Sequence, residues 1–392
     1  MLVKITDLKT FLVGIEDRYG IYGLTIVKLE TDSGLCGWGE AYSPWTPRSR
    51  EPTLNYLKEW IKGKDPFQIK RIWEMLYRDF LCNLGGIVQL SALSAIDIAL
   101  YDIVGKMLKT PVYNLIGGKF RDRIRVYDSF SWHTGRNTTK VFAEEAASVA
   151  KAGFTAIKWG PFGTPFPGRE HIRMGIECVR AVREAVGDDV DILIDCSRNL
   201  TPRGTITVAR ELAKYNIFWL EEPVASDNLD ALARITANVS MPTVTGEMLY
   251  TKWALRQALE KQAADIINPD VGAVGGITEM KEVSAMAQAY DVLVSPHNLL
   301  GPIGTSASLH LAASIPNFLI LENWRSPGTM WEKVWDDISA EPSMEMENGC
   351  IKVPSKPGLG VEVNEDALTR YKYIEKPTPG MNFTYEHEQG AF

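Results

Sequence analysis

Seven charged or titratable side chains recur along the chain after residue 150, each at the end of a short apolar run. After a first step of 37 residues, they follow one another at steps of 23 to 27 residues. A step of this size is typical of a strand followed by a helix, and the carboxyl ends of parallel strands meet at one edge. We therefore expect these side chains to converge. They are Lys158, Asp195, Glu221, Glu247, Asp270, His297 and Glu322.

Three of the seven are carboxylates on successive strands, namely Asp195, Glu221 and Glu247. Carboxylates brought together repel each other, and their pKa values rise unless a cation neutralises them. An all-oxygen ligand set suits a hard divalent ion, so the sequence predicts a Mg²⁺ site. Glu222 follows Glu221 directly and points to the opposite face of the strand, so we expect it to support the site or to begin the next helix.

Asp270 and His297 end the next two strands and should be neighbours. A lone histidine is more often structural, but a carboxylate beside an imidazole fixes its tautomer and raises its basicity. The pair therefore predicts a general base. Glu322 ends the last strand and Lys158 the second, so we expect them to approach a ligand from opposite sides. Lys158 would offer positive charge to an anion, and Glu322 would donate a hydrogen bond if the site raises its pKa.

The elements that must position these residues form two regions. Residues 2–14 and 22–31 read as strands, and residues 91–108 follow with helical spacing, which fits a small α+β capping domain. Eight strand-like segments then alternate with helical stretches, which predicts a (β/α)8-type barrel. We expect the turn-rich residues after 324 to fold back onto the first domain. The eight segments are RVYDSF, TAIKWG, DILID, IFWLE, TVTGE, DIINPD, VLVSPH and FLILE.

Composition excludes several classes of protein. The chain has 392 residues, a net charge of −7, 45% hydrophobic and 23% charged residues, which is ordinary globular usage. An acidic chain disfavours nucleic acid as the main partner. Its five cysteines lie far apart without a CxxC pair, so we expect reduced thiols. Without an apolar signal core, or a run near the roughly 18 apolar residues of a membrane span, we expect a cytoplasmic protein and no membrane contact.

With these motifs in order, the sequence resembles the enolase superfamily, specifically its mandelate racemase subgroup (the mandelate racemase/muconate lactonizing enzyme family). The resemblance covers nearly the whole chain. It is carried by TAIKWGPFG, ILIDCSRN, FWLEEPV, VTGEMLY, INPDVGAVGGITE, VSPHNLLGP and LILENW, by GWGEAYSP, SAIDIALYDIVGK and PVYNLIGG in the first region, and by KPGLGVEV near the end.

The resemblance implies an α/β protein with an N-terminal α+β capping domain and a modified TIM barrel, (β/α)7β. Their expected bounds are residues 1–122 and 123–350, with residues 351–392 packing back on the capping domain. It also implies Asp195, Glu221 and Glu247 as metal ligands, and His297 with Asp270 as the base dyad. Glu322 would donate a hydrogen bond to an enediolate oxygen. A symmetric homo-oligomer, from dimer to octamer, is implied as well.

Within that subgroup the sequence looks most like acid-sugar dehydratases of the galactonate and mannonate type, with two departures. Racemases carry K-x-K at the second strand, where this chain has Lys158 and Gly160. Galactonate-type dehydratases carry a histidine two residues after the first metal ligand, where this chain has Ser197. A second base and the usual leaving-group acid are thus both missing.

We therefore expect a Mg²⁺-dependent aldonate or aldarate dehydratase, a hydro-lyase, in which His297 takes the α-proton and then protonates the departing β-hydroxyl. The product would be a 2-keto-3-deoxy acid. His133, after the first strand, is a possible substitute acid or a substrate contact. Ser197 would hydrogen-bond the substrate, Trp45 would cover the site and Trp324 would wall it. Two alternatives stay open, a cycloisomerase or epimerase of sugar acids or their lactones, and a non-catalytic binding protein on the same scaffold.

Overall fold

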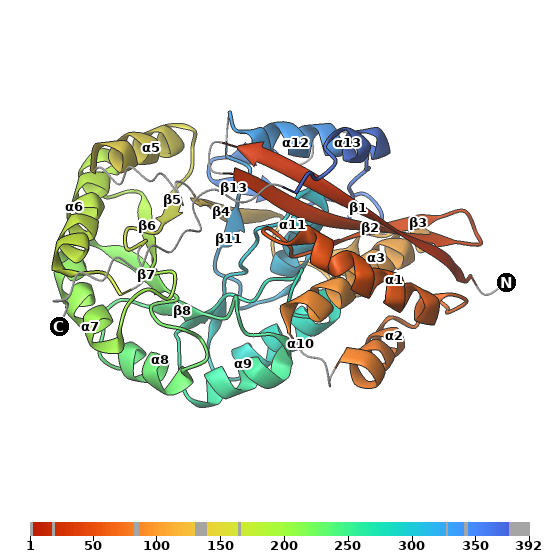
Figure 1. Ribbon diagram of the computed structural model, residues 1–392, viewed down its shortest axis with the longest axis horizontal. Coiled ribbons are helices and arrows are strands. Elements are labelled where there is room, and N and C mark those ends of the chain that lie inside the picture. The colour runs from red at the N-terminus through yellow and green to blue at the C-terminus, as the bar shows by residue number, and fades with distance from the viewer. Residues whose placement is uncertain are drawn as a thin grey trace.

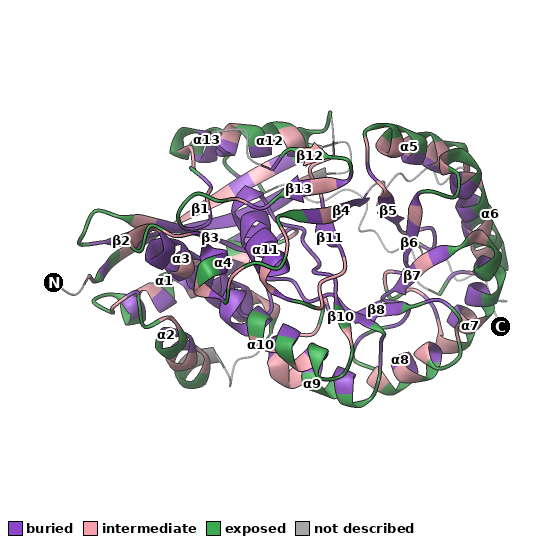
Figure 2. Cartoon of the chain, turned by 180° about the vertical axis from the view of Figure 1, so that it is seen from behind, coloured by how far each residue is buried: buried purple, intermediate pink, exposed green. Residues whose placement is uncertain are grey.

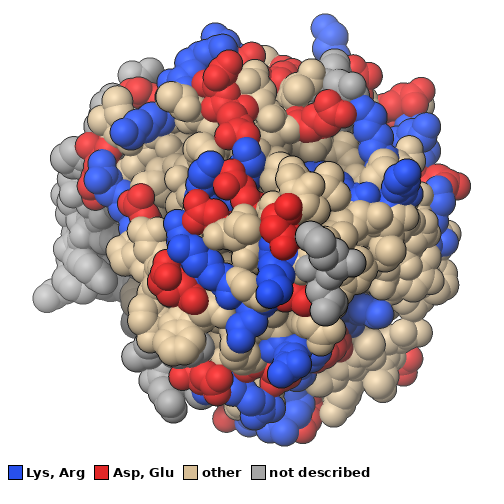
Figure 3. All heavy atoms as spheres, turned by 90° about the vertical axis from the view of Figure 1, so that its right-hand side faces the viewer, with Lys and Arg blue, Asp and Glu red and all other residues tan. Residues whose placement is uncertain are grey.

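The computed structural model describes residues 3–17, 20–81, 86–129, 139–163, 166–326, 328–340 and 344–375. Figure 1 shows a ring of strands and helices on one side and a smaller sheet covered by helices on the other. The burial colours of Figure 2 follow this arrangement, with the strands of the ring buried and the outward faces of its helices exposed. The face seen in Figure 3 carries acidic and basic side chains intermixed, without one sign dominating it.

The first region is an antiparallel sheet with the order β1-β2-β3. Helix α3 lies against β3, and two glycines allow this approach. A Cβ at Gly39 would lie 1.9 Å from the carbonyl oxygen of Ala95, and one at Gly37 would lie 2.2 Å from that of Ala99. The elements are β1 (Ile5–Asp17), β2 (Gly20–Thr31), β3 (Cys36–Ala41), η1 (Pro47–Ser49), α1 (Arg50–Ile61), α2 (Ile69–Leu76), η2 (Tyr77–Leu81), α3 (Ile87–Met107) and α4 (Val112–Leu115).

Helix α3 is the most apolar long helix among the described residues. Its 21 residues are long and apolar enough, by length and composition, to cross a membrane. However, 78% of its most apolar window is buried inside the protein, as in the core helix of a globular domain. Asp97 and Asp102 interrupt its apolar sequence.

The second region is a closed ring of eight parallel strands. Its hydrogen-bonded order runs from β10 through β9, β8, β7, β6 and β5 to β4, and β11 pairs with β4. A parallel bridge from Val294 to Phe318 joins β10 to the residues before β11 and closes the ring. The strands are β4 (Arg123–Ser129), β5 (Ala156–Trp159), β6 (Asp191–Asp195), β7 (Ile217–Glu221), β8 (Thr243–Thr245), β9 (Ile266–Ile267), β10 (Leu293–Val294) and β11 (Leu321–Asn323).

A helix follows each of the first seven strands, as a (β/α)7β barrel requires. These are α5 (Thr139–Lys151), α6 (Arg169–Val186), α7 (Pro202–Leu212) with η3 (Ala213–Tyr215), α8 (Leu229–Thr236), α9 (Thr251–Glu260), α10 (Gly276–Gln288) and α11 (Pro302–Ser314). All eight strand-like segments of the sequence thus contain strands, and the expected fold class is confirmed.

Strands β8, β9 and β10 end earlier than the apolar runs suggested. Glu247, Asp270 and His297 therefore lie in loops, two or three residues beyond the ladder. Proline explains two of these endings, because Pro269 and Pro296 have no N–H to donate to a neighbouring strand. The loops still leave the same end of the barrel.

The chain after β11 contacts both regions. It forms α12 (Met330–Ile338), β12 (Met346–Glu347), β13 (Cys350–Lys352) and α13 (Glu365–Arg370). Strand β13 pairs antiparallel with the first half of β4. Further on, the Tyr373 amide donates to the Leu12 carbonyl at 2.8 Å, so this segment also lies along β1. The domain bounds at residues 122 and 350 stay predictions.

Candidate active site

Three carboxylates from neighbouring strands meet at the carboxyl end of the barrel. Asp195 ends β6, Glu221 ends β7 and Glu247 follows β8. One oxygen of each lies within 4.8 Å of the others. Asp195 and Glu221 follow the buried residues Leu193 and Trp219 by two positions, so they share the inward face of their strands. The three oxygens form a donor set that can hold a hard cation.

Neighbouring polar groups hold each of these three residues in place. The backbone N–H of Ser197 donates to Asp195 Oδ1 at 2.6 Å, and its hydroxyl donates to the same oxygen at 3.1 Å. The Asn268 side chain bridges the other two, since its Nδ2 donates to Glu221 Oε1 at 3.1 Å and its Oδ1 accepts from the Glu247 amide at 3.0 Å. The indole N–H of Trp219 also donates to Glu221 Oε2 at 3.1 Å, so the site is held in place by neighbouring donors while one oxygen of each acid stays within reach of the others.

Burial raises the pKa of the first two acids against the effect of nearby cations. The pKa of Asp195 is about 6, and that of Glu221 lies well above its ordinary value despite the charge of Lys158. Burial acts in the same direction on Glu247, but His297 and Arg198 outweigh it and lower the pKa. Three carboxylates that cannot easily ionise together are stabilised when a divalent cation neutralises them. Their oxygen atoms are the donors that such a cation prefers.

Lys158 lies inside this cluster, which corrects the expected arrangement. Its ammonium nitrogen is 2.7 Å from Glu221 Oε1, 2.9 Å from Glu322 Oε1 and 3.9 Å from Asp195 Oδ2, and the residue is 1% exposed. Lys158 and Glu322 therefore do not approach from opposite sides. Strand β4 alone separates β11 from β5 in the closed ring, so the two side chains meet.

The expected dyad is present. His297 Nδ1 lies 2.8 Å from Asp270 Oδ2, and the Gly272 amide donates to Asp270 Oδ1 at 2.7 Å. The other ring nitrogen, Nε2, lies 3.7 Å from both Glu247 Oε2 and Glu322 Oε2 and so faces the carboxylates. Burial alone would lower the pKa of His297, but these acids and Asp270 outweigh it and raise the pKa to about 10.

Glu322 differs from the expected hydrogen-bond donor. Burial would raise its pKa, but Lys158 and His297 outweigh burial and hold the pKa at about 2. The Asn298 amide also donates to Glu322 Oε2 at 3.0 Å, which favours the ionised form. In this arrangement Glu322 is a carboxylate that accepts hydrogen bonds, because the two cations contact it directly.

Two further charged residues support the site, and only the first of them, Arg198, was not expected from the sequence. Arg198 Nη1 lies 2.5 Å from Glu247 Oε1, in a loop where Ser197 and Arg198 have φ values of 48° and 65°. Its position three residues after Asp195 was the available signal. Glu222, expected to have a supporting role, is fully buried and accepts hydrogen bonds from Thr245 Oγ1 at 2.8 Å and the Gly246 amide at 3.0 Å.

The residues expected to contact substrate lie in different surroundings. Ser197 holds Asp195, as described above. Trp45 and Trp324 both lie against Tyr22, with ring centroids at 4.7 Å and 6.2 Å, in an aromatic cluster between the two regions. The ring edge of Tyr42 reaches His297, with centroids 5.5 Å apart. His133 lies outside the described residues.

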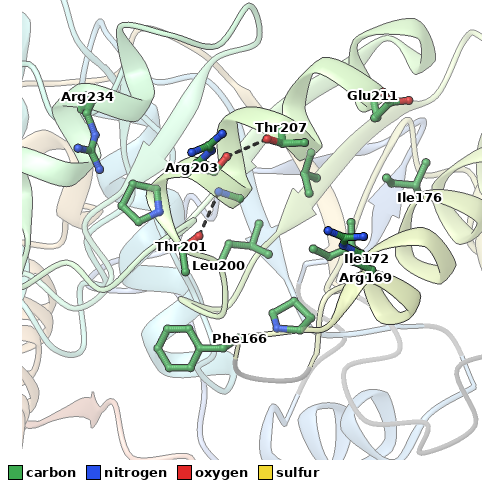
Figure 4. A pocket seen from close by; sticks show the side chains of 14 residues that line it. Phe166, Arg169, Ile172, Ile176, Leu200, Thr201, Arg203, Thr207, Glu211 and Arg234 are labelled. Atoms are coloured by element: carbon green, nitrogen blue, oxygen red, sulfur yellow. Dashed lines mark hydrogen bonds between the residues drawn. The ribbon is translucent and has the colours of Figure 1, made fainter. Parts of the chain in front are cut away.

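A separate cavity of about 590 Å³ lies on the outer side of the barrel between α6 and α7. Figure 4 shows its apolar lining, including Phe166, Ile172, Ile176 and Leu200. Arginines at its edge are exposed. The cavity is lined by outer helices and by the loop before α7, so it is distinct from the carboxylate cluster.

Comparison with known proteins covers the same two regions. The mandelate racemase / muconate lactonizing enzyme N-terminal domain family matches residues 20–117, and the enolase C-terminal domain-like family matches residues 141–367. A D-xylonate dehydratase of Haloferax volcanii is 36% identical over 93% of this chain and 88% of its own length. A D-galactonate dehydratase of Xanthomonas euvesicatoria is 32% identical over 93% and 94%.

A solved structure supports the same assignment. The 3,6-anhydro-D-galactonate cycloisomerase from Zobellia galactanivorans superimposes with a TM-score of 0.85 at 30% identity, over 95% of this chain and 100% of that one. Matches of this extent in both regions establish the family. The chain belongs to the mandelate racemase/muconate lactonizing enzyme family of the enolase superfamily.

Proposed function

We propose that this protein is a Mg²⁺-dependent sugar-acid dehydratase, a hydro-lyase that acts on an aldonate or aldarate. The observation that carries the proposal is the dyad of His297 and Asp270, whose second ring nitrogen lies 3.7 Å from Glu247, a member of the cluster of three carboxylates. Relatives over nearly the full length of the chain bear the names of D-xylonate and D-galactonate dehydratases.

Asp195, Glu221 and Glu247 would hold the cation, which would supply positive charge next to the substrate carboxylate and make its α-proton more acidic. Lys158 adds a second positive charge at the same place, 2.7 Å from Glu221. Charge that is fixed in a buried site stabilises a developing anion more strongly than charge in water does.

His297 Nε2 then accepts the α-proton while Asp270 holds Nδ1–H and stabilises the imidazolium. The C2–H and C3–O bonds break, a C2=C3 double bond forms, and the imidazolium returns its proton to the departing hydroxyl as water. The resulting enol becomes a 2-keto-3-deoxy acid. One residue serves both transfers because Ser197 is not an acid near neutral pH.

A cycloisomerase is the second candidate. Gly160 and Ser197 remove the second base and the leaving-group acid, whereas a single base suffices for cycloisomerisation. The solved cycloisomerase is 30% identical to this chain. A non-catalytic binding protein would not need the ordered dyad.

The test uses D-xylonate, D-gluconate and D-galactonate with Mg²⁺ in D₂O. Formation of a 2-keto acid, trapped as its semicarbazone, supports the dehydratase, and isomerisation without a keto acid supports the second candidate. His297→Asn should abolish α-deuterium exchange, whereas His171→Asn, at an exposed position, should leave it unchanged. Exchange that persists in His297→Asn would exclude the proposed base.

A further inference from the structure

The two dyad residues lie in loops that lead directly into helices. The N-cap residue of each helix is a glycine, which has no side chain that could accept a hydrogen bond from the first turn. The loop of Asp270 enters α10 after Gly275, and the loop of His297 enters α11 after Gly301. The first N–H groups of a helix have no partner within the helix and need an acceptor elsewhere. In both helices the acceptor is a carboxylate from the capping domain.

Glu40, from β3, serves α11. Its Oε1 accepts a hydrogen bond from the Gly301 amide at 2.5 Å, and its Oε2 accepts one from the Gly304 amide at 2.9 Å. The residue is fully buried. Only three residues separate His297 from Gly301, so these bonds fix the far end of the histidine loop.

Asp97, from α3, serves α10 in the same way. Its Oδ2 accepts from the Thr278 amide at 3.0 Å, and its Oδ1 accepts from the Thr278 hydroxyl at 2.6 Å. The contact is close, since a Cβ at Gly276 would lie 2.3 Å from Asp97 Oδ2. Ser94, one turn earlier in α3, accepts from the Gly275 amide at 3.0 Å.

A third contact from the capping domain reaches the dyad itself. The Tyr42 amide, two residues after Glu40, donates to the Gly272 carbonyl at 2.9 Å. Gly272 is the residue whose own amide holds Asp270. The Tyr42 ring meets the imidazole of His297 edge-on. The end of β3 thus contacts both dyad loops.

We propose that Glu40 and Asp97 are positioning residues for the base dyad. By capping α11 and α10 from the other domain, they hold the loops of His297 and Asp270 in the register that brings Nδ1 and Oδ2 together. The capping domain therefore completes the base as well as covering the barrel. The assignment of the dyad as the base rests on the proposed function.

Asp102 provides a matched control for a purely structural role. It is as buried as Glu40 and also accepts hydrogen bonds from two backbone amides, those of Trp38 and Leu359, each at 2.9 Å. It lies on the same helix as Asp97. Its partners belong to β3, to the returning C-terminal segment and, through an ion pair with Lys106 Nζ at 2.6 Å, to its own helix, all away from the dyad loops. Loss of its charge should weaken packing without moving the base.

The experiment compares Glu40→Gln, Asp97→Asn and Asp102→Asn with the wild type. Gln keeps the size of Glu40 but offers one acceptor oxygen to two amides. Because a displacement of about 1 Å can cost about 100-fold in rate, we expect Glu40→Gln to lower kcat for α-deuterium exchange at least about 10-fold. KM and Mg²⁺ affinity should stay within about 2-fold of wild type, since the carboxylate cluster is untouched.

Asp97→Asn should give a smaller loss of kcat, because Asn also caps helices well. Asp102→Asn should lower the apparent Tm to a similar extent as Glu40→Gln but keep kcat within about 2-fold. Wild-type kcat in Glu40→Gln, or equal losses in Glu40→Gln and Asp102→Asn, would overturn the proposal. If Glu40→Gln does not fold, Asp97→Asn carries the same comparison.

A second measurement does not depend on turnover. The Nδ1–H proton of His297, hydrogen-bonded to Asp270, should give a far-downfield NMR resonance that His297→Asn removes. We expect this resonance to be broadened or lost in Glu40→Gln and retained in Asp102→Asn; retention in both would overturn the proposal. If the wild type exchanges no α-proton from any of the three sugar acids, the proposed function fails, and the resonance alone decides the positioning role.

Discussion

Replacing Lys158 with Met is the sharpest test of how the cluster is held together. Met has a similar length and fits an apolar environment, but it removes the ammonium group that lies within 4 Å of Glu221, Glu322 and Asp195 at once. Those carboxylates are themselves buried. The variant protein would have to keep them uncharged or tolerate their mutual repulsion.

The magnitude follows from the distances. At an effective dielectric constant of about 20, a pair of unit charges at 2.7 or 2.9 Å attracts by roughly 6 kcal/mol. Desolvation of each ion offsets several kcal/mol of that attraction, and breaking one side of a buried pair typically costs about 3–5 kcal/mol. We expect a loss in this range without metal, or an apparent Tm lowered by about 6–10 °C at about 2 °C per kcal/mol.

The assay is thermal unfolding of metal-free protein, repeated with increasing Mg²⁺. Because a cation bound to the carboxylates replaces the missing charge, Mg²⁺ should raise the Tm of Lys158→Met more than that of the wild type. Lys252→Met is the matched control, since it breaks a 3.0 Å pair with the buried Glu279 on the outer helices, where Mg²⁺ should restore nothing. An unchanged Tm in metal-free Lys158→Met, or equal effects of Mg²⁺ on both variants, would refute this reasoning.

Four further predictions follow from the site and the fold. Mg²⁺ binding near pH 8 should release a proton, because the pKa of about 10 for His297 depends on carboxylates that the ion neutralises; calorimetry in buffers of different ionisation heat measures this. Without metal, the contribution of His297 to the free energy of unfolding should be full below about pH 6.5 and should be lost as the pH rises to about 10. The free energy of unfolding in urea should therefore vary less with pH in His297→Asn than in the wild type. Gly39→Ala should lower the free energy of unfolding by at least about 1–3 kcal/mol, as its Cβ would overlap the Ala95 carbonyl, whereas Gly63→Ala, with nothing near its Cβ, should show only the strain of its positive φ. Ser197→His should increase keto-acid formation relative to α-deuterium exchange if a missing acid limits the loss of hydroxide, and an unchanged ratio would show that His297 suffices.

The strand ends of the barrel were predictable because they recur at regular intervals in the sequence. The seven side chains that follow this interval all lie at the carboxyl end of the barrel. The relation between Lys158 and Glu322 was not predictable in the same way. Their sequence positions place them far apart, and only the closure of the ring, with β11 beside β4, brings them to 2.9 Å. Their pKa values depend on that contact.

The roles of Glu40 and Asp97 were also hidden in the sequence. Their motifs were noted for the resemblance, yet each partner lies 181 to 264 residues away. Nothing in a local pattern indicates which helix N-terminus a distant carboxylate will cap. Short loops and strands follow from local chemistry, whereas contacts between the two regions follow from the complete fold.

The bridge between Val13 and Lys372 has a consequence for how the chain folds. The edge of β1 is covered only by a segment far along the chain, and β4 pairs with β11 and β13, which are also distant in sequence. Such long-range contacts slow folding and leave apolar surface exposed in intermediates. We therefore expect slow refolding after dilution from denaturant, with yields that fall as the protein concentration rises.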